Sequence, residues 1–279
     1  MVFAHPDDET LAAGALLAKM AVIGVETHLV VATAGEAGWK ASPRPEPAEV
    51  ARHRESELRA AAHVLGVRSV RVLGFPDGNL ERAPEDKVVG MIAERIRDVR
   101  PDAVLTFGPD GITGHPDHAA VSRFTTAAVT AAAVTPASTM AEAMFPPPAV
   151  GALWYVGMTA TQHRSYEALI GPLEWRRVDP PLRPGPWEPW TVTGTVDTRA
   201  YAGAVRKAVL CHGSQLRDSE TLRAAPTSAW QAAFGRTALR RALTPGEGYD
   251  PIARELLTDS PFLEFYLPAA GAVTGVGLA

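Results

Sequence analysis

The chain has 279 residues, a formal net charge of −4 and a single cysteine, Cys211. Hydrophobic residues make up 46% and charged residues 21%, which excludes a disordered chain and predicts a globular core. The sequence has no basic stripe of the kind that binds nucleic acid or membrane surfaces, and one cysteine excludes an internal disulfide. The N-terminus lacks a signal-peptide pattern, and the longest uncharged run, residues 124–141, is interrupted by threonines, a serine and a proline. We therefore expect a cytoplasmic protein with no membrane span, whose partner is a small molecule.

The first 125 residues alternate short β-rich runs with helical stretches, which is typical of a parallel sheet with crossover helices. Helical spacing and end signals predict helices over residues 9–24, 47–67 and 88–99. The strands expected here are residues 1–4, 27–33, 69–75 and 102–107. Only three residues precede Ala4, so either the first of these strands is short or the recorded start of the sequence is late.

Prolines punctuate the sequence after residue 135 and predict long loops. Between the prolines we expect strands over residues 152–158, 190–196 and 262–268, and a helix over residues 198–216. No internal repeat or linker is evident, so we predict one domain over residues 1–279. Its α/β fold is expected to have a Rossmann-like, mostly parallel sheet with flanking helices over residues 1–135, followed by an elaborated C-terminal part over residues 136–279.

Two similar clusters of histidine, proline and aspartate are the candidate functional motifs of this sequence. The first reads AHPDDE from Ala4 to Glu9 and follows the first expected strand; the second reads GHPDH from Gly114 to His118 and follows the strand over 102–107. Ligand sites in open parallel sheets form at the carboxyl ends of strands, so the clusters meet if these two strands are neighbours. The alternative is that both clusters are turns and helix caps, because aspartate is a good N-cap residue.

Histidines and carboxylates in this arrangement predict a divalent-metal site. Neutral imidazole with carboxylate suits zinc best and also suits iron or manganese, and a catalytic zinc needs only three protein ligands. His5 and Asp8 are three residues apart and can aim at one point, whereas the adjacent Asp7 projects elsewhere. If a helix opens at Pro116, His115 and His118 share a face, so that one can bind metal while the other faces the substrate.

These two motifs, in this order and about 110 residues apart, resemble those of the PIG-L/LmbE-like de-N-acetylases. That family consists of zinc-dependent enzymes that remove acetyl groups from molecules bearing N-acetylglucosamine, and it includes the mycothiol-pathway deacetylase and related thiol-conjugate amidases. The resemblance covers the first 125 residues well and the remainder loosely. It implies a small amino-sugar substrate, and Zn²⁺ as the metal, with Fe²⁺ as an alternative.

Position by position, the resemblance implies that His5, Asp8 and His118 bind the metal and that Asp7 is the general base. It also implies that a protonated His115 stabilises the tetrahedral intermediate and that Asp117 orients His115. This agrees with metal-assisted amide hydrolysis, in which the metal lowers the pKa of a water molecule and a base accepts its proton.

The same resemblance implies that Arg54, Glu36 and Asp77 bind the sugar. The alternative is an intrahelical ion pair of Arg54 with Glu57, and plain turn residues at positions 36 and 77. His212 and Gln215, in the segment CHGSQ, also resemble a segment of relatives, although a role at the end of a helix explains them equally well. Thr113 stands where some relatives have a tyrosine, so no tyrosine is expected to assist from that loop.

The function predicted from the sequence is therefore zinc-dependent removal of an N-acetyl group from an N-acetylglucosamine-containing small molecule. An amidase that cleaves a larger acyl group or a thiol conjugate would use the same motifs. A different class is a non-catalytic, metal-containing sugar-binding protein. A metal phosphoesterase is disfavoured, because such sites often hold two metals and need more ligands than these clusters offer.

Overall fold

The computed structural model describes residues 1–39, 42–134, 150–174, 181–216 and 219–243, together with Ile252, Leu256 and Leu257. The strands in this part of the chain are β1 (Val2–Phe3), β2 (His28–Thr33), β3 (Ser69–Phe75), β4 (Ala103–Phe107), β5 (Ala152–Gly157), β6 (Gly194–Asp197) and β7 (Arg236–Leu243). The α-helices are α1 (Asp8–Val22), α2 (Pro47–Val64), α3 (Glu85–Val99), α4 (Pro116–Val134), α6 (Ala160–Leu169), α7 (Ala202–Cys211), α8 (Ser219–Ala224) and α9 (Thr227–Phe234). Short 3₁₀ helices are η1 (Leu80–Arg82), η2 (Pro189–Thr191), η3 (Arg199–Tyr201) and η4 (Gly213–Gln215).

The strands form two sheets that meet at β1 and β4. The first sheet has the order β1-β2-β3 and is parallel. The second has the order β4-β5-β7-β6, in which β4 and β5 are parallel and β7 runs antiparallel to both β5 and β6. Thr106 Oγ1 on β4 donates a hydrogen bond to the carbonyl of Val2 on β1 at 2.8 Å, and the rings of Phe3 and Phe107 lie 4.9 Å apart. The two strands that precede the His-Pro-Asp clusters are therefore neighbours.

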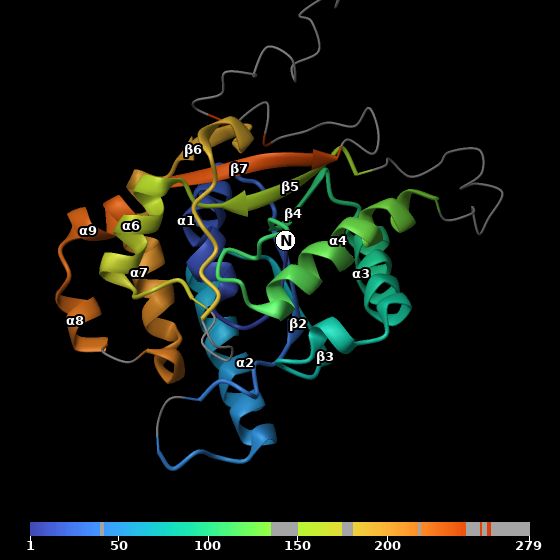
Figure 1. Ribbon diagram of the computed structural model, residues 1–279, viewed down its shortest axis with the longest axis horizontal. Helices are drawn as coiled ribbons and strands as arrows, with labels where there is room; N and C mark the ends of the chain where they lie inside the picture. The colour runs from blue at the N-terminus through green and yellow to red at the C-terminus, as the bar shows by residue number, and fades with distance from the viewer. Residues whose placement is uncertain are drawn as a thin grey trace, which may run out of the picture.

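Helices cover both faces of these sheets. α3 and α4 pack together on one side, and α1, α2 and α7 pack together on the other (Figure 1). The stripe Val88, Ile92 and Ile96 that predicts α3 is buried, and one hydrophobic core cluster includes residues from both the N-terminal and the C-terminal elements. The expected α/β fold with a mostly parallel sheet is confirmed. Within the described ranges, no helix combines the length and the apolar character needed to cross a bilayer.

Several C-terminal elements differ from the sequence-based expectations. The strand expected over 190–196 begins later, at Gly194, because η2 occupies Pro189–Thr191. The strand expected over 262–268 lies outside the described residues. The central antiparallel strand β7 was not expected, because its sequence RTALRRAL contains three arginines. The guanidinium carbon of Arg240 lies 4.6 Å from the ring centroid of Trp187, and that of Arg241 lies 5.9 Å from the ring centroid of Trp154. These two arginines of β7 therefore pack on aromatic faces.

The contact between β1 and β4 can be tested by substitution. Thr106→Val removes the hydroxyl that binds the carbonyl of Val2, and we expect the free energy of unfolding to fall by about 1–3 kcal/mol because a buried acceptor loses its donor. Thr125→Val is the matched control, because Thr125 is fully buried and its hydroxyl has no partner among the described residues. Chemical denaturation should show no loss of stability for this control, and an equal loss in the two variants would contradict the expectation.

Candidate metal and active site

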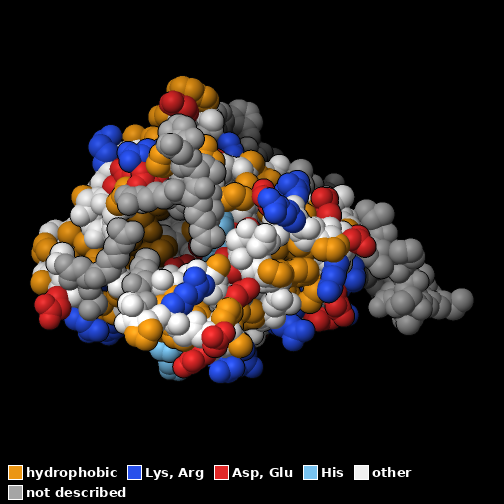
Figure 2. All heavy atoms as spheres, turned by 60° about the horizontal axis from the view of Figure 1, so that its bottom comes forward, with side chains coloured by type: hydrophobic (Ala, Val, Ile, Leu, Met, Phe, Trp, Pro, Cys, Tyr) orange, Lys and Arg blue, Asp and Glu red, His pale blue; other side chains and the backbone are white. Residues whose placement is uncertain are grey.

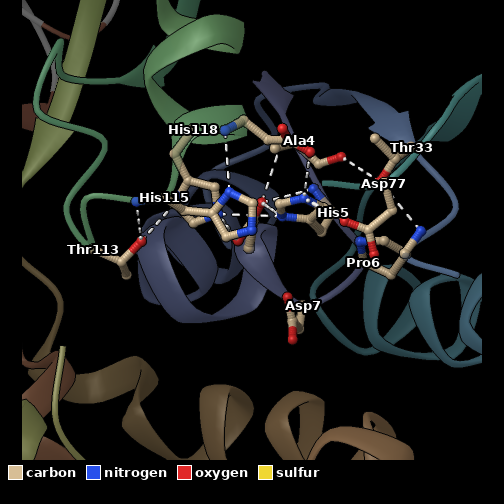
Figure 3. A network of polar contacts seen from close by, with 12 residues as sticks. Ala4, His5, Pro6, Asp7, Thr33, Asp77, Thr113, His115 and His118 are labelled. Carbon is tan, nitrogen blue, oxygen red and sulfur yellow. Dashed lines mark hydrogen bonds and ion pairs between the residues drawn. The ribbon is translucent and has the colours of Figure 1, made fainter. Parts of the chain in front are cut away.

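Both His-Pro-Asp clusters lie at the carboxyl ends of β1 and β4, where helices α1 and α4 begin. His5 and Asp8 stand at the start of α1, and His118 lies in the first turn of α4. Figure 3 shows the rings of His5 and His118 pointing toward one another from these two elements. Nδ1 of His5 is 3.2 Å from Nε2 of His118, although the two residues are 113 positions apart in the sequence.

Hydrogen-bond partners fix which nitrogen of each ring carries the proton. Nε2 of His5 lies 3.1 Å from Asp77 Oδ1 and 3.2 Å from Asp117 Oδ2, and ionised carboxylates only accept, so the proton of a neutral His5 is on Nε2. Nδ1 of His118 is 2.9 Å from the carbonyl of Gly111, which also only accepts, so that nitrogen carries the proton. Nδ1 of His5 and Nε2 of His118 therefore direct their lone pairs at the same point.

Asp8 completes the set around this point. Its Oδ2 accepts hydrogen bonds from the backbone N–H groups of Ala4 and His5 at 3.2 and 2.7 Å, and its Oδ1 lies 3.3 Å from Nε2 of His118. Nδ1 of His5 lies 3.5 Å from the same carboxylate. Ligand atoms around a tetrahedral zinc lie about 3.3 Å apart, because each is about 2.0–2.2 Å from the metal. The separations among His5, Asp8 and His118 fit a single tetrahedral ion.

The charge distribution around the pair of imidazoles also suits a cation. Burial alone lowers the pKa of a histidine, but hydrogen bonds to Asp117, Asp77 and Asp8 raise the pKa of His5 well above its usual value. Burial alone raises the pKa of a carboxyl, but the neighbouring His118 and His5 hold the pKa of Asp8 well below its usual range. Carboxylates thus surround two buried rings, and a positive charge is favoured between them.

A second group, His5, His115 and Asp117, also brings potential ligand atoms close together. The carboxylate of Asp117 is already occupied, because it accepts hydrogen bonds from His5, from Gly78 N–H at 2.8 Å and from Leu80 N–H at 2.9 Å. Nδ1 of His115 accepts the backbone N–H of Asp117 at 3.1 Å. The set His5, Asp8 and His118 is therefore the better metal site of the two.

Asp7 points away from this site, although it lies between Pro6 and Asp8 in the chain. Its φ of 107° and ψ of −27° place the backbone in the left-handed region, which favours glycine and is strained for aspartate. The backbone N–H of Asp7 is held by Glu9 Oε2 at 3.0 Å, and its carboxylate lies 3.3 Å from Arg54. Figure 3 shows the Asp7 side chain directed away from the two imidazoles. The backbone turn thus separates two adjacent carboxylates.

A cavity of about 710 Å³ opens beside Asp7. Asp7 and His115 line it on the side of the metal site, and Tyr166 and Leu169 of α6 line it on another side with Leu216. In Figure 2 a hollow on this face of the molecule has hydrophobic side chains on its wall. The arrangement joins a candidate metal site and an adjacent carboxylate to a space large enough for a small molecule.

Comparison with known proteins agrees with this geometry. Residues 1–129 match the family described as PIG-L: GlcNAc-PI de-N-acetylase. The chain is 32% identical over 244 residues to the 1D-myo-inositol 2-acetamido-2-deoxy-α-D-glucopyranoside deacetylase of Rhodococcus jostii, covering 77% of this chain and 80% of that relative. The chain belongs to the PIG-L family. The family predicted from the two motifs is thereby confirmed, as is the class of enzyme, an N-deacetylase.

Solved structures share the fold of this PIG-L chain. The N,N'-diacetylchitobiose deacetylase of Pyrococcus horikoshii aligns with a TM-score of 0.60 at 19% identity, covering 88% of this chain and 82% of that chain. The 4-carboxy-2-hydroxymuconate hydratase GalB of Pseudomonas putida aligns with a TM-score of 0.58 at 19% identity, covering 87% of this chain and 94% of that chain. Because a deacetylase and a hydratase both have this fold, the fold alone does not specify the reaction.

The three residues expected to bind sugar make contacts within the protein around the candidate metal site. Arg54 is 3% exposed; it donates to the carbonyls of Gly35 and Pro6 and pairs with Asp7. Glu36 accepts the N–H of Asp77 at 2.9 Å, which connects two of the loops around the site. None of Arg54, Glu36 and Asp77 lines the cavity described above, so their contact with substrate stays a prediction.

Glu57 does not form the intrahelical ion pair with Arg54 that the sequence offered as an alternative. Its carboxylate instead accepts hydrogen bonds from the backbone N–H and the hydroxyl of Ser214, at 2.7 and 2.6 Å. Glu57 therefore ties α2 to η4, whereas Arg54 supports Asp7.

His115 and Asp117 are arranged differently from the sequence-based expectation. The carboxylate of Asp117 holds His5, and only its backbone N–H orients His115. Burial and the charges of His5 and His118 lower the pKa of His115 to about 3, so its ring is neutral near pH 7 rather than protonated. With Nδ1 accepting from the backbone, the ring proton of His115 is on Nε2, which is then the hydrogen-bond donor.

Sequence reasoning missed two buried groups beside the site. Glu9 is fully buried and its Oε1 lies 2.8 Å from Nε2 of His212, so this glutamate connects α1 to the end of α7. Tyr166 is 4% exposed and lines the cavity, and its ring centroid lies 5.6 Å from that of Phe234. The segment CHGSQ is the sequence signal for His212, whereas no motif marks Tyr166.

Replacement of Asp117 tests whether it supports the metal site. In Asp117→Asn a neutral amide replaces the carboxylate whose Oδ2 lies 3.2 Å from Nε2 of His5, and we expect the affinity for zinc to fall by about 10- to 100-fold. Competition with a chromophoric chelator measures this change, after a thermal melt has shown that the variant is folded. Asp98→Asn, on the exposed side of α3, is the matched control and should leave the affinity unchanged. An unchanged affinity in Asp117→Asn would contradict the supporting role.

Proposed function

We propose that this PIG-L chain hydrolyses the N-acetyl group of an N-acetylglucosamine-containing small molecule, releasing acetate and a free amine. The observation that carries the proposal is the convergence of Nδ1 of His5, Nε2 of His118 and the Asp8 carboxylate next to Asp7, which faces a cavity. The names of the relatives, which are deacetylases of N-acetylglucosamine derivatives, support this choice of substrate.

His5, Asp8 and His118 would hold the metal. Two neutral imidazoles and a carboxylate are a common zinc set, and Fe²⁺ is the alternative ion. A bound divalent metal supplies Lewis-acid chemistry, because it polarises the amide carbonyl and makes a water molecule more acidic. In a neutral His5, Asp77 and Asp117 hold the ring proton on Nε2, which leaves the lone pair of Nδ1 for the metal.

Asp7 is the general base in this proposal. It accepts a proton from the water molecule as the water oxygen attacks the carbonyl carbon of the acetamide. It then returns that proton to the amine nitrogen as the carbon–nitrogen bond breaks. Burial raises the pKa of Asp7, while Arg54 opposes and Asp8 adds to the shift. A carboxyl with a raised pKa is a stronger base once it is ionised, which suits this role.

Two side chains can donate hydrogen bonds to the oxygen that becomes negative in the transition state. Nε2–H of His115 is one, because its Nδ1 is held by the backbone N–H of Asp117. The hydroxyl of Tyr166 is the other, because Tyr166 lines the same cavity as Asp7 and His115. Burial and the charges of Asp7 and Asp8 raise the pKa of Tyr166, so the phenol stays protonated and can donate.

Asp7→Asn tests the proposed base. We expect kcat for release of free amine from N-acetylglucosamine derivatives to fall by about 10²- to 10⁴-fold, because the amide cannot accept the proton. Metal content, measured by elemental analysis, should be unchanged because Asp7 is outside the set of ligands. Asp98→Asn is again the control. A non-catalytic sugar-binding protein would show no turnover with or without the substitution, and that result would reject the proposal.

Tyr166→Phe tests the proposed donor. The change removes one hydroxyl and keeps the ring contact with Phe234, so we expect stability to be preserved and kcat to fall by about 10- to 100-fold with little change in KM. Tyr201→Phe, outside the cavity, is the matched control and should leave kcat unchanged. If kcat is the same in Tyr166→Phe and in the parent chain, the phenol has no role in the reaction.

A further inference from the structure

The cavity beside Asp7 has one polar region and one apolar region. The polar region is the catalytic end, formed by Asp7, His115 and Tyr166. The apolar region, which we call the apolar wall, comes from α1, the end of α6 and the segment from η4 to α8. It consists of Leu11, Leu169, Ile170, Leu173, Leu216 and Leu222. A substrate whose amide reaches Asp7 has this wall as its other neighbour.

Three polar side chains that line the cavity with the apolar wall, those of Glu174, Gln215 and Thr221, already have partners within the protein. Trp39 Nε1 and His212 Nδ1, on two other lining residues, have no hydrogen-bond partner among the described residues. Glu174 pairs with Arg183. The amide nitrogen of Gln215 donates to the carbonyl of Gly38 at 3.1 Å and to Ser214 Oγ at 2.9 Å. Thr221 likewise has a partner within the protein. A ligand hydroxyl beside Glu174, Gln215 and Thr221 would compete with these existing contacts, which disfavours a polyol in that part of the cavity.

Four members of the apolar wall are only half-buried. Leu11, Leu169, Ile170 and Leu216 pack against the core with part of each side chain and line the cavity with the rest. Apolar surface left open to water in a cavity is stabilised when an apolar group of a ligand covers it, and each buried methylene strengthens binding by about three- to fourfold. The wall therefore fits a hydrocarbon group better than a sugar or a cyclitol.

We infer that the substrate of this chain carries an apolar group next to its acetamido-sugar or amide, and that this group binds the apolar wall. The inference rests on the proposed function for the position of the amide and adds the class of substituent. The group is either the aglycone attached to the sugar or a longer acyl chain on its nitrogen. Both present the same chemistry to the wall, and kinetics distinguish them.

Two series of substrates test the inference with the zinc-loaded protein. The first contains methyl, butyl and hexyl glycosides of N-acetylglucosamine and its myo-inositol glycoside; the second contains methyl glucosaminides with acetyl, butanoyl and hexanoyl groups on nitrogen. We expect kcat/KM for amine release to rise about tenfold or more along one series, which identifies the source of the apolar group. A flat response in both series, or highest kcat/KM with the inositol glycoside, would overturn the inference.

Substitutions in the wall provide the second measurement. Leu169→Gln and Leu216→Gln should lower the ratio of kcat/KM between the longest and shortest members of the responsive series by about tenfold. Val22→Gln is the matched control, because Val22 is 73% exposed on α1 and does not line the cavity, and the ratio should not change. An unchanged ratio in both wall variants would place the apolar group elsewhere.

Binding separates failure of this inference from failure of the proposed function. Calorimetry on Asp7→Asn measures the affinity for the hexyl glycoside, the myo-inositol glycoside and the N-hexanoyl glucosaminide in the absence of turnover. If a hexyl- or hexanoyl-bearing ligand binds more tightly but the parent chain releases no amine from any substrate, the proposed deacetylase activity is rejected and binding of an apolar group to the apolar wall is supported. If the parent chain releases amine but shows no preference for the apolar ligands, the proposed deacetylase activity is supported and the role of the apolar wall in binding is rejected.

Discussion

The site depends on two histidine lone pairs that are held facing one another inside the protein. Nδ1 of His5 and Nε2 of His118 are 3.2 Å apart, and neither carries the proton when both rings are neutral. Two neutral rings would repel each other there, so either a proton or a metal cation is favoured at the point that both nitrogens face. The carboxylates of Asp8, Asp77 and Asp117 around the rings favour that cation. The remaining features of the site follow from the need to keep these groups in place.

The fold brings these histidines together through two short strands. β1 and β4 are adjacent because Thr106 binds the carbonyl of Val2 and Phe3 packs against Phe107. Each strand ends just before a His-Pro-Asp cluster, and α1 and α4 start within those clusters. The left-handed backbone of Asp7 then turns one carboxylate toward the cavity while Asp8 stays at the candidate metal site. A candidate ligand and a proposed base thus come from consecutive residues.

Much of this was predictable from the sequence, because the N-terminal elements have strong local signals. Short β-rich runs identified β2, β3 and β4, the paired motifs indicated a metal site, and the family resemblance implied the set His5, Asp8 and His118, which the structure brings together. The supporting contacts were harder to predict, because they depend on distances between loops. No local sequence pattern indicates that the carboxylate of Asp117 binds His5 while the backbone N–H of Asp117 binds His115. Nor does any local pattern indicate that Arg54 pairs with Asp7. β7 and Tyr166 were missed because packing on distant aromatic rings, rather than periodicity, determines their positions.

The presence and position of the metal are the central claim. Diffraction data collected from crystals of the metal-loaded chain at the absorption edge of zinc would locate the ion directly. The account predicts a single anomalous peak per chain, within coordination distance of Nδ1 of His5, Nε2 of His118 and the Asp8 carboxylate. No peak at that position, or two ions bound by other residues, would contradict it.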